Sequence, residues 1–302
     1  MASMLLTILK LPIYFIMEVI YLIFRCRPQK EIKNQHVLIT GAAQGIGAEY
    51  ARQFAEMGNT VHCVDIVSEM INETVDALKS KGHKAFAYTC DLTKPEQVES
   101  LYKDITDAGY TVTILVNNAG VAFGASLTDM SLTQIQHSIN VNLVSNMWLI
   151  KLFLPKMIEL DHGHVVNMAS LAGMLPLRNS TDYCAAKAGS IHMMTQLRMQ
   201  NVGTNIKFTA VCPFFVKTGM ITGLEDKLAG KYILPEELVT TAIKGIRQNK
   251  EVVIAPAKAK FVVFILKHLP VPLRDSWYKK NLINASSEFS TFVGQKMMEK
   301  IK

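Results

Sequence analysis

Three residues in one stretch of the chain, Ser170, Tyr183 and Lys187, have the types and the spacing that acid–base catalysis needs. Tyr183 and Lys187 are four residues apart, so on a helix they share one face. The ordinary pKa of a tyrosine is about 10, which is too high for proton transfer near neutral pH. A lysine ammonium about 4 Å away would favour the phenolate by roughly 4 kcal/mol, or about three pKa units. We therefore expect Lys187 to lower the pKa of Tyr183 and to make it a general acid and base.

The elements before this stretch decide whether it is a catalytic site or the solvated face of an ordinary helix. The apolar run His36–Thr40 predicts a buried strand, and a glycine-rich turn and a helical pattern follow it directly. Glycines let the backbone approach a pyrophosphate, whose charge meets the helix N-terminus. A strand before the turn and a helix after it therefore predict a dinucleotide site. The residues of the turn expected to contact the cofactor are Gly41, Gln44, Gly45, Ile46 and Gly47.

An acidic residue ends the second predicted strand, Thr60–Asp65, 18 residues after Gly47. A carboxylate there accepts hydrogen bonds from the adenosine ribose and repels a 2′-phosphate, so Asp65 predicts NAD over NADP. An ordinary turn acid at the strand end is the alternative. Further cofactor contacts are expected at the ends of the next two strands, from Asp91, Leu92, Asn118, Ala119 and Gly120.

Strand-like and helical segments alternate throughout this part of the chain. That order predicts an α/β fold, a single doubly wound, Rossmann-type parallel sheet with right-handed crossovers. We expect the dinucleotide-binding and catalytic domain to cover residues 34–256.

The motifs together are similar to those of the short-chain dehydrogenase/reductase family. The similarity runs from about His36 to Thr218 and depends on several motifs in the same order. It is closer to the membrane-bound branch that holds the 17-beta-hydroxysteroid dehydrogenases types 11 and 13 and the epidermal retinol dehydrogenases. The motifs are Thr40-Gly41-x-x-x-Gly45-x-Gly47, Asn117-Asn118-Ala119-Gly120, Asn142, Ser170, Tyr183-x-x-x-Lys187 and, for the branch, His162-Gly-His-Val-Val, Cys212-Pro-Phe-Phe-Val-Lys-Thr-Gly219 and Phe289-Ser-Thr-Phe-Val-Gly-Gln-Lys296.

This resemblance implies a role for each matching residue. Tyr183 would exchange a proton with the substrate hydroxyl, and Ser170 would hydrogen-bond the same oxygen. Lys187 would lower the pKa of the tyrosine and bind the nicotinamide ribose, and Asn142 would hold a water that connects the lysine to solvent. Asn140, two residues before Asn142, is the alternative for this last role. Further cofactor contacts implied are Tyr183, Lys187, Pro213, Val216 and Thr218.

One position departs from the family pattern. The family commonly has Pro-Gly after the sixth strand, whereas here Pro213 is followed by Phe214. The two phenylalanines either wall the substrate pocket or only pack under a loop. The residues expected to form an apolar substrate pocket are Leu171, Leu175, Phe214, Phe215 and Met220.

The chain has 302 residues and a net charge of +7, and the positive charge is concentrated at the C-terminal end. Residues 244–302 hold 12 Lys/Arg against 4 Asp/Glu, so the rest of the chain is nearly neutral. Such a patch attracts nucleic acid or an anionic membrane. Because an apolar run accompanies the basic residues and no base-stacking platform does, we expect a membrane and no nucleic acid.

Two segments outside the catalytic domain predict membrane contact. Residues 1–27 include the apolar stretch Met4–Phe24, whose 21 residues would reach about 30 Å as a helix. The cost of its two charged residues nearly cancels the gain from its apolar ones, so spanning and lying in the interface are both open. Residues 257–302 form a helical, basic and apolar extension, in which the run Lys258–Lys267 suits an interfacial helix, with a dimerising or core-capping helix as the alternative. Basic residues after the first segment place the domain on the cytoplasmic side.

Five scattered cysteines, an odd number, show neither metal spacing nor a disulfide framework, which predicts a reducing compartment. His162 and His164 lack a third ligand at useful spacing, so we expect no metal site.

We therefore expect an NAD-dependent oxidoreductase that interconverts a hydrophobic primary or secondary alcohol, such as a steroid, a retinoid or another lipid alcohol, and its carbonyl. The alternative is a membrane-surface scaffold with minor dehydrogenase activity. From the resemblance, the expected location is the endoplasmic reticulum membrane or the lipid droplet, and the expected assembly is a homodimer through helices near 130–158 and 182–201.

Overall fold

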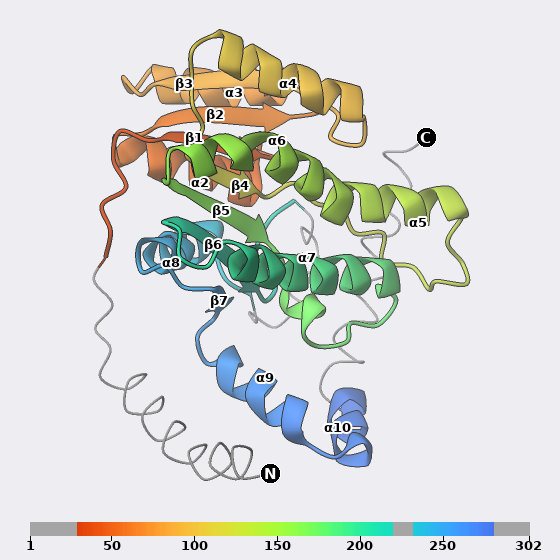
Figure 1. Cartoon of the computed structure of the whole chain (residues 1–302). Coiled ribbons are helices and arrows are strands. Elements are labelled where there is room, and N and C mark those ends of the chain that lie inside the picture. Colours follow the sequence, from red (N-terminus) through yellow and green to blue (C-terminus); the bar gives the residue numbers. More distant parts are fainter. Residues whose placement is uncertain (1–28, 220–231, 281–302) are drawn as a thin grey trace. The chain divides into compact units, whose positions relative to one another are not determined.

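One parallel sheet organises the part of the chain that the computed structural model describes, residues 29–219 and 232–280. The chain divides into two units, Met1–Lys30 and Glu31–Lys302, and the fold described here belongs to the second. Within the described residues, seven strands pair in the order β3-β2-β1-β4-β5-β6-β7 (Figure 1), so the predicted parallel α/β sheet is confirmed. The strands are β1 (His36–Thr40), β2 (Thr60–Asp65), β3 (Ala85–Thr89), β4 (Ile114–Asn117), β5 (Gly163–Met168), β6 (Ile206–Pro213) and β7 (Val252–Ala255).

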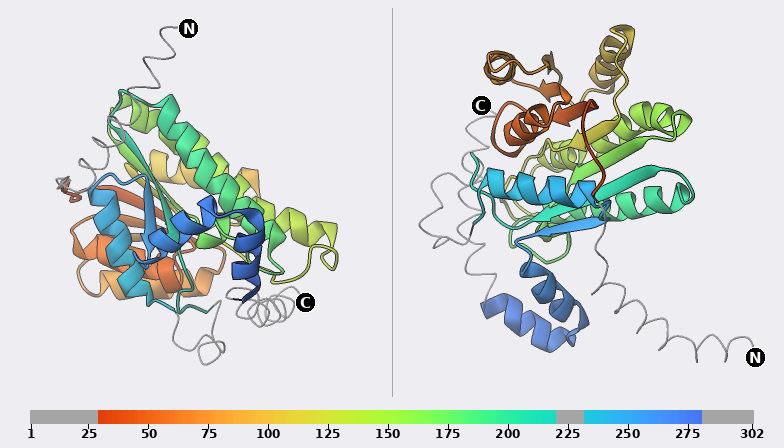
Figure 2. Two further views of the ribbon diagram at one scale, coloured as in Figure 1. Left: turned by 90° about the horizontal axis from the view of Figure 1, so that it is seen from below. Right: turned by 90° about the vertical axis from the view of Figure 1, so that its left-hand side faces the viewer.

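Helices cover both faces of this sheet (Figure 2). On one face pack α2, α3 and α8, and on the other α4, α6 and α7. The helices are α2 (Gly45–Glu56), α3 (Ser68–Lys79), α4 (Pro95–Asp107), α5 (Leu132–Ile139), the π-helix η1 (Asn140–Val144), α6 (Ser145–Glu159), the 3-10 helix η2 (Leu171–Gly173), α7 (Thr181–Gln200), α8 (Pro235–Arg247), α9 (Ala259–His268) and α10 (Val271–Tyr278).

The apolar runs of the central strands explain this layering. Successive side chains of a strand point to opposite faces. In β1, Val37 and Ile39 belong to the core cluster on one face and Leu38 to the cluster on the other, and all three are fully buried. A strand that is covered on both faces needs apolar residues throughout, which is the pattern of a parallel sheet between two helical layers.

The sheet reverses its direction of growth between β1 and β4. The chain moves outward from β1 to β3, crosses back, and then builds β4 to β7 on the other side of β1. A doubly wound sheet opens a crevice at such a reversal, at the carboxyl ends of the strands. Here those ends are Thr40 and Asn117, and the predicted glycine turn and the Asn118–Gly120 segment follow them directly.

Helix α9 covers most of the apolar run predicted as an interfacial helix. Val263 and Leu266 are buried, and Val263 packs into one of the core clusters, whereas Phe261 and Phe264 are 68% and 61% exposed. No helix within residues 29–219 and 232–280 has both the length and the apolar character that a membrane crossing requires. The anchor predicted for residues 1–27, Met220 with the loop after it, and residues 281–302 of the C-terminal extension lie outside the described residues.

The His-x-His pair at the start of β5 has hydrogen-bond partners within the fold. His162 Nε2 lies 2.8 Å from Gln35 Oε1, and His164 Nε2 lies 2.8 Å from Thr209 Oγ1. Both rings therefore connect the amino-terminal end of β5 to neighbouring segments.

Candidate active site

The turn between β1 and α2 needs glycine for two different reasons. Gly41 and Gly45 have φ angles of 64° and 60°, in the left-handed region that other residues rarely adopt. Gly47 lies in the first turn of α2, where an added Cβ would stand 2.0 Å from the carbonyl oxygen of Gly41. The turn is thus held against the start of the helix, and the unpaired N–H groups there suit a phosphate group.

Hydrogen bonds around Thr40 join the ends of β1 and β4. Thr40 Oγ1 accepts from the backbone N–H groups of Asn118 at 2.9 Å and Ala119 at 3.1 Å. In return, Asn118 Nδ2 donates to the carbonyl oxygens of Thr40 at 2.9 Å and Gly41 at 3.2 Å. These bonds set the spacing between the two walls of the crevice.

The two acidic side chains predicted to face a cofactor are held in place by backbone groups. Asp65 Oδ2 accepts from the N–H of Ala43 at 3.0 Å, and its Oδ1 accepts from the N–H of Val67 at 3.2 Å. Asp91 Oδ1 accepts from the N–H and the hydroxyl of Thr93 at 2.9 and 2.7 Å. Because a carboxylate has about four acceptor sites, each group keeps capacity for a ligand hydroxyl or amine.

These elements enclose a cleft along the carboxyl ends of the strands, which we call the glycine-turn cleft. It holds most of the residues that the sequence predicts for the cofactor and also some that it does not, such as Ile66 and His137. It is lined by Gly41, Gln44, Gly45, Ile46, Asp65, Ile66, Cys90, Asp91, Leu92, Thr93, Asn118, Ala119, Gly120, Val121, His137, Val141, Thr218 and Gly219. Gly47 is absent from this lining because it packs beneath the turn.

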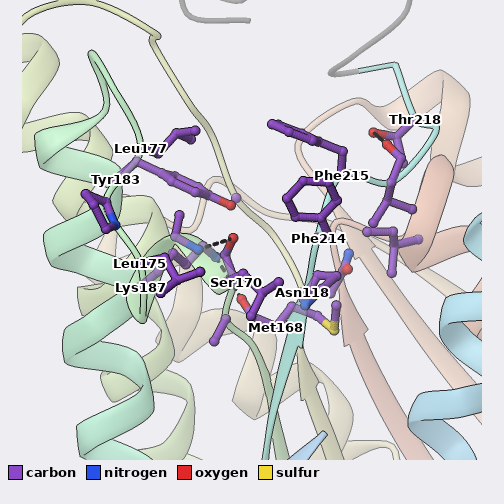
Figure 3. Close-up of a pocket in the computed structure, with 18 residues that line it drawn as sticks. Asn118, Met168, Ser170, Leu175, Leu177, Tyr183, Lys187, Phe214, Phe215 and Thr218 are labelled. Carbon is purple, nitrogen blue, oxygen red and sulfur yellow. Dashed lines mark hydrogen bonds between the residues drawn. The ribbon is translucent and has the colours of Figure 1, made fainter. Parts of the chain in front are cut away.

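Ser170, Tyr183 and Lys187 come together at one end of this region (Figure 3). Tyr183 and Lys187 lie one turn apart on α7, and Ser170 directly precedes η2. Helix η2 packs so closely on α7 that a Cβ on Gly173 would stand 2.7 Å from the carbonyl carbon of Lys187. Ser170 Oγ accepts from the N–H of Ala172 at 3.1 Å, and the serine side chain hydrogen-bonds the Tyr183 phenol.

In this arrangement burial opposes the acidification of Tyr183 that was expected from Lys187. Burial raises the pKa of Tyr183 to about 12, and the hydrogen bond with Ser170 offsets only part of that rise. Burial also lowers the pKa of Lys187 to about 8. Lys187 Nζ lies 5.5 Å from the centre of the tyrosine ring and donates to the carbonyl oxygen of Met168 at 2.8 Å. Since the ammonium is directed at a carbonyl, loss of hydration outweighs charge pairing, and near neutral pH Tyr183 is a protonated phenol.

A π-helical turn between α5 and α6 places Asn142 near Lys187. Asn142 is fully buried, and its Nδ2 donates to the carbonyl oxygens of Val121 at 2.8 Å and Ser138 at 2.9 Å. A Cβ built on Gly120 would stand 3.0 Å from Asn142 Oδ1 and 3.4 Å from Lys187 Nζ. The two polar groups therefore border one small gap, which exists because residue 120 has no side chain. π-Helical turns are rare and occur frequently at functional sites.

The alternative residue, Asn140, has a different environment. Its Oδ1 accepts from Nε2 of Gln136, one turn earlier, at 2.7 Å on an exposed surface. Of the two asparagines, Asn142 is the one whose side chain faces Gly120.

A largely apolar cavity, which we call the Tyr183 cavity, adjoins the glycine-turn cleft and shares Ile46, Asn118, Gly120 and Thr218 with it. It contains the pocket residues that the sequence predicts within the described chain; Met220 lies outside those residues. The Tyr183 cavity is lined by Ile46, Asn118, Gly120, Met168, Ala169, Ser170, Leu171, Ala172, Leu175, Pro176, Leu177, Tyr183, Lys187, Pro213, Phe214, Phe215, Val216 and Thr218.

Comparison with known families decides the class of this site. A family model described as short chain dehydrogenase matches residues 35–229, more than half of the chain, including the glycine turn, Ser170, Tyr183 and Lys187. The chain belongs to this family. Short-chain dehydrogenases use NAD(P), so the protein is an oxidoreductase of the alcohol–carbonyl type that acts on a small-molecule substrate.

Two curated relatives and one solved structure agree with the membership of this chain in the short-chain dehydrogenase family. It is 34% identical to epidermal retinol dehydrogenase 2 of Mus musculus over 251 residues, which cover 81% of each chain. It is 32% identical to estradiol 17-beta-dehydrogenase 11 of Macaca fascicularis over 296 residues, which cover 97% of each. A crystal structure of a short chain dehydrogenase/reductase from Burkholderia phymatum in complex with NAD has the same fold, with a TM-score of 0.74 at 22% identity over 83% of this chain and 97% of that one.

Replacing Lys187 by methionine tests the effect of its burial. The pKa of Lys187 is about 8 in the folded chain against 10.5 for an unperturbed lysine, so the unfolded chain binds more protons between these pH values. Below pH 8 the buried Lys187 therefore lowers the free energy of unfolding of the wild type by about 3 kcal/mol. This destabilisation disappears as the pH rises to 10.5. We expect the stability advantage of Lys187→Met over wild type, measured by urea denaturation, to shrink by about that amount across this range. Lys79→Met on α3 is the control, and a constant advantage for Lys187→Met would contradict burial as the cause.

Proposed function

We propose that this short-chain dehydrogenase uses NAD to interconvert a hydrophobic alcohol, such as a steroid, a retinoid or another lipid alcohol, and its carbonyl. One observation carries the proposal: Ser170, Tyr183 and Lys187 face a largely apolar cavity that adjoins the glycine-turn cleft. The names of the relatives, a retinol dehydrogenase and an estradiol dehydrogenase, support a lipid alcohol.

Four side chains would take part in the proton transfer, each with a different role. In carbonyl reduction, Tyr183 gives its phenolic proton to the substrate oxygen, and in alcohol oxidation it takes that proton back. Ser170 hydrogen-bonds the same oxygen and positions it. Lys187 and Asn142 border the gap at Gly120. Lys187, with a water held by Asn142, would pass the proton between Tyr183 and solvent. The nicotinamide, when bound, supplies or accepts the hydride at the carbinol carbon.

The described residues fit a dinucleotide. The glycine turn and the start of α2 suit the pyrophosphate, Asp65 the adenosine ribose, and Asp91 and Leu92 the adenine. Asn118, Ala119 and Gly120 line the middle of the site, and Pro213, Val216 and Thr218 the end nearest Tyr183. Since no lysine or arginine lines the glycine-turn cleft within the described residues, whereas Asp65 does, the charge favours NAD over NADP.

We also propose that the protein works at a membrane surface, on the cytoplasmic side of the endoplasmic reticulum or of lipid droplets. Helix α9 supports this proposal, because it exposes Phe261 and Phe264 between Lys258, Lys260 and Lys267. Exposed aromatic side chains flanked by lysines suit an interface between water and anionic lipid. The predicted segment 1–27 would add a second contact.

A homodimer through α6 and α7 is part of the proposal. Met147 and Ile158 of α6 and Met199 of α7 are 43%, 44% and 55% exposed, respectively. Sedimentation equilibrium would show twice the chain mass, and a single chain mass at all concentrations would contradict the dimer. A scaffold role, the alternative, needs neither Tyr183 nor Lys187, and we do not propose it.

Removing the phenolic hydroxyl tests the catalytic assignment. Tyr183→Phe keeps the ring in its packing but leaves no group to exchange the proton. We expect kcat/KM for alcohol oxidation to fall about 100- to 10,000-fold, the usual contribution of a general acid–base group. NADH binding, followed by its fluorescence, should change much less than kcat/KM, because the glycine turn and Asp65 would hold the rest of the cofactor. Retention of full activity would refute the role of Tyr183.

Neutralising Asp65 tests the cofactor preference. Asp65→Asn has nearly the same shape but does not repel a 2′-phosphate. Two unit charges about 4 Å apart interact by about 1 kcal/mol in water and about 4 kcal/mol near a protein surface. The ratio of kcat/KM with NADP to that with NAD should therefore rise at least about fivefold. A wild type that uses both cofactors equally, or a ratio that the substitution leaves unchanged, would contradict the NAD assignment.

Replacing the exposed phenylalanines of α9 tests the membrane contact. We expect the double variant Phe261→Ser/Phe264→Ser to bind vesicles of phosphatidylcholine and phosphatidylserine at least about tenfold more weakly, because each buried phenylalanine contributes about 1.5 to 3 kcal/mol. Leu132→Ser, at a leucine of α5 that is 85% exposed, is the matched control. Equal binding by wild type and the double variant in flotation assays would remove α9 from the proposal.

A further inference from the structure

Two adjacent phenylalanines after β6, Phe214 and Phe215, both line the Tyr183 cavity. In an extended chain, successive side chains point to opposite sides, so two neighbouring rings on one cavity require a change of direction. The chain bends at Phe214, directly after β6 ends at Pro213. The bend turns both rings toward the same space, where they lie across from Tyr183 and Leu177 (Figure 3).

Backbone hydrogen bonds hold this segment on both of its sides. The N–H of Phe214 donates to the carbonyl oxygen of Ala255 at 2.8 Å, at the end of β7. The N–H of Ile233 donates to the carbonyl oxygen of Phe215 at 2.9 Å, and the N–H of Lys217 donates to that of Ile233 at 2.9 Å. The backbone that carries the two rings is therefore fixed to the sheet by hydrogen bonds. As a result, the cavity wall formed by the rings is preorganised for a substrate.

The rings also pack on each other. Their centres are 4.6 Å apart and their planes meet at 64°, an edge-to-face pair. Such a pair presents an aromatic wall to the cavity, whereas Leu171, Leu175 and Leu177 contribute aliphatic side chains. A flat unsaturated group gains ring–ring contacts with an aromatic wall that a saturated group of similar size does not make.

We propose that the Phe214–Phe215 pair is a specificity determinant that favours alcohols with a flat unsaturated group, aryl or alkenyl, next to the carbinol carbon. This inference rests on the proposed dehydrogenase function, since Ser170 and Tyr183 hold the reacting oxygen in the same cavity. A glycine at position 214, as the family commonly has, would bring no ring to this wall. The pair thus distinguishes this chain from family members that have glycine at position 214, and it adds to the shared catalytic residues.

Two alcohols with the same carbon skeleton test the proposal. Cinnamyl alcohol is flat and conjugated next to its carbinol carbon, and cyclohexylpropanol is its saturated counterpart. The measured quantity is the ratio of kcat/KM for the two alcohols, compared between full-length wild type and the variants Phe214→Leu and Phe215→Leu. Differences in the intrinsic reactivity of the alcohols cancel in this comparison. We expect each variant to lower the preference for cinnamyl alcohol about two- to tenfold, the size of one aromatic pair contact.

Matched controls separate specificity from a general loss of packing. Phe86→Leu makes the same exchange in β3, away from the Tyr183 cavity, and should leave the ratio unchanged, and Phe215→Tyr keeps the ring and should retain the preference. Unfolding temperature and NADH binding confirm that each variant is folded. An unchanged ratio in both Phe→Leu variants, with an active wild type, overturns this inference alone. A wild type that oxidises neither alcohol nor a retinoid or steroid overturns the dehydrogenase function and this inference with it.

Discussion

The hydrogen bonds between Thr40 and Asn118 are the constraint on which the site depends. They join the ends of β1 and β4, the two strands between which the sheet reverses, and so set the width of the crevice. Each part of the site is placed relative to this junction. The glycine turn begins directly after Thr40. Gly120 lies two residues after Asn118, and its lack of a side chain leaves space beside Asn142 and Lys187.

Burial decides the electrostatics of the catalytic residues. The close packing of η2 on α7 brings Ser170 to Tyr183, and the same packing leaves Tyr183 partly buried and Lys187 almost fully buried. Desolvation disfavours the charged form of each group, which raises the pKa of the phenol and lowers that of the amine. The tyrosine is thus held as a proton donor near neutral pH. A cation that approaches its oxygen would shift the balance toward the phenolate.

Local patterns predicted the sheet and its helices with small errors at the ends. The predicted strand 60–65 has the observed bounds, and the helix expected near 182–201 is observed as α7, Thr181–Gln200. These elements follow from local rules: runs of apolar residues need burial on both faces, and glycine, proline and polar residues interrupt them. The π-helical turn η1 has no such local pattern. It depends on hydrogen bonds from Asn142 to Val121, 21 residues away, and a regular helix was expected there.

The sequence by itself determined the chemistry that is available, the order of the strands and helices, and the family. It determined them because residue types, their spacing and the positions of glycines are properties of the chain alone. Only the tertiary structure decided where the Lys187 ammonium points, that Gly120 separates it from Asn142, and that Phe214 and Phe215 share one cavity. The physical reason is that the pKa of a group and the shape of a cavity depend on burial and on neighbours distant in sequence, which exist only after the sheet has closed around them.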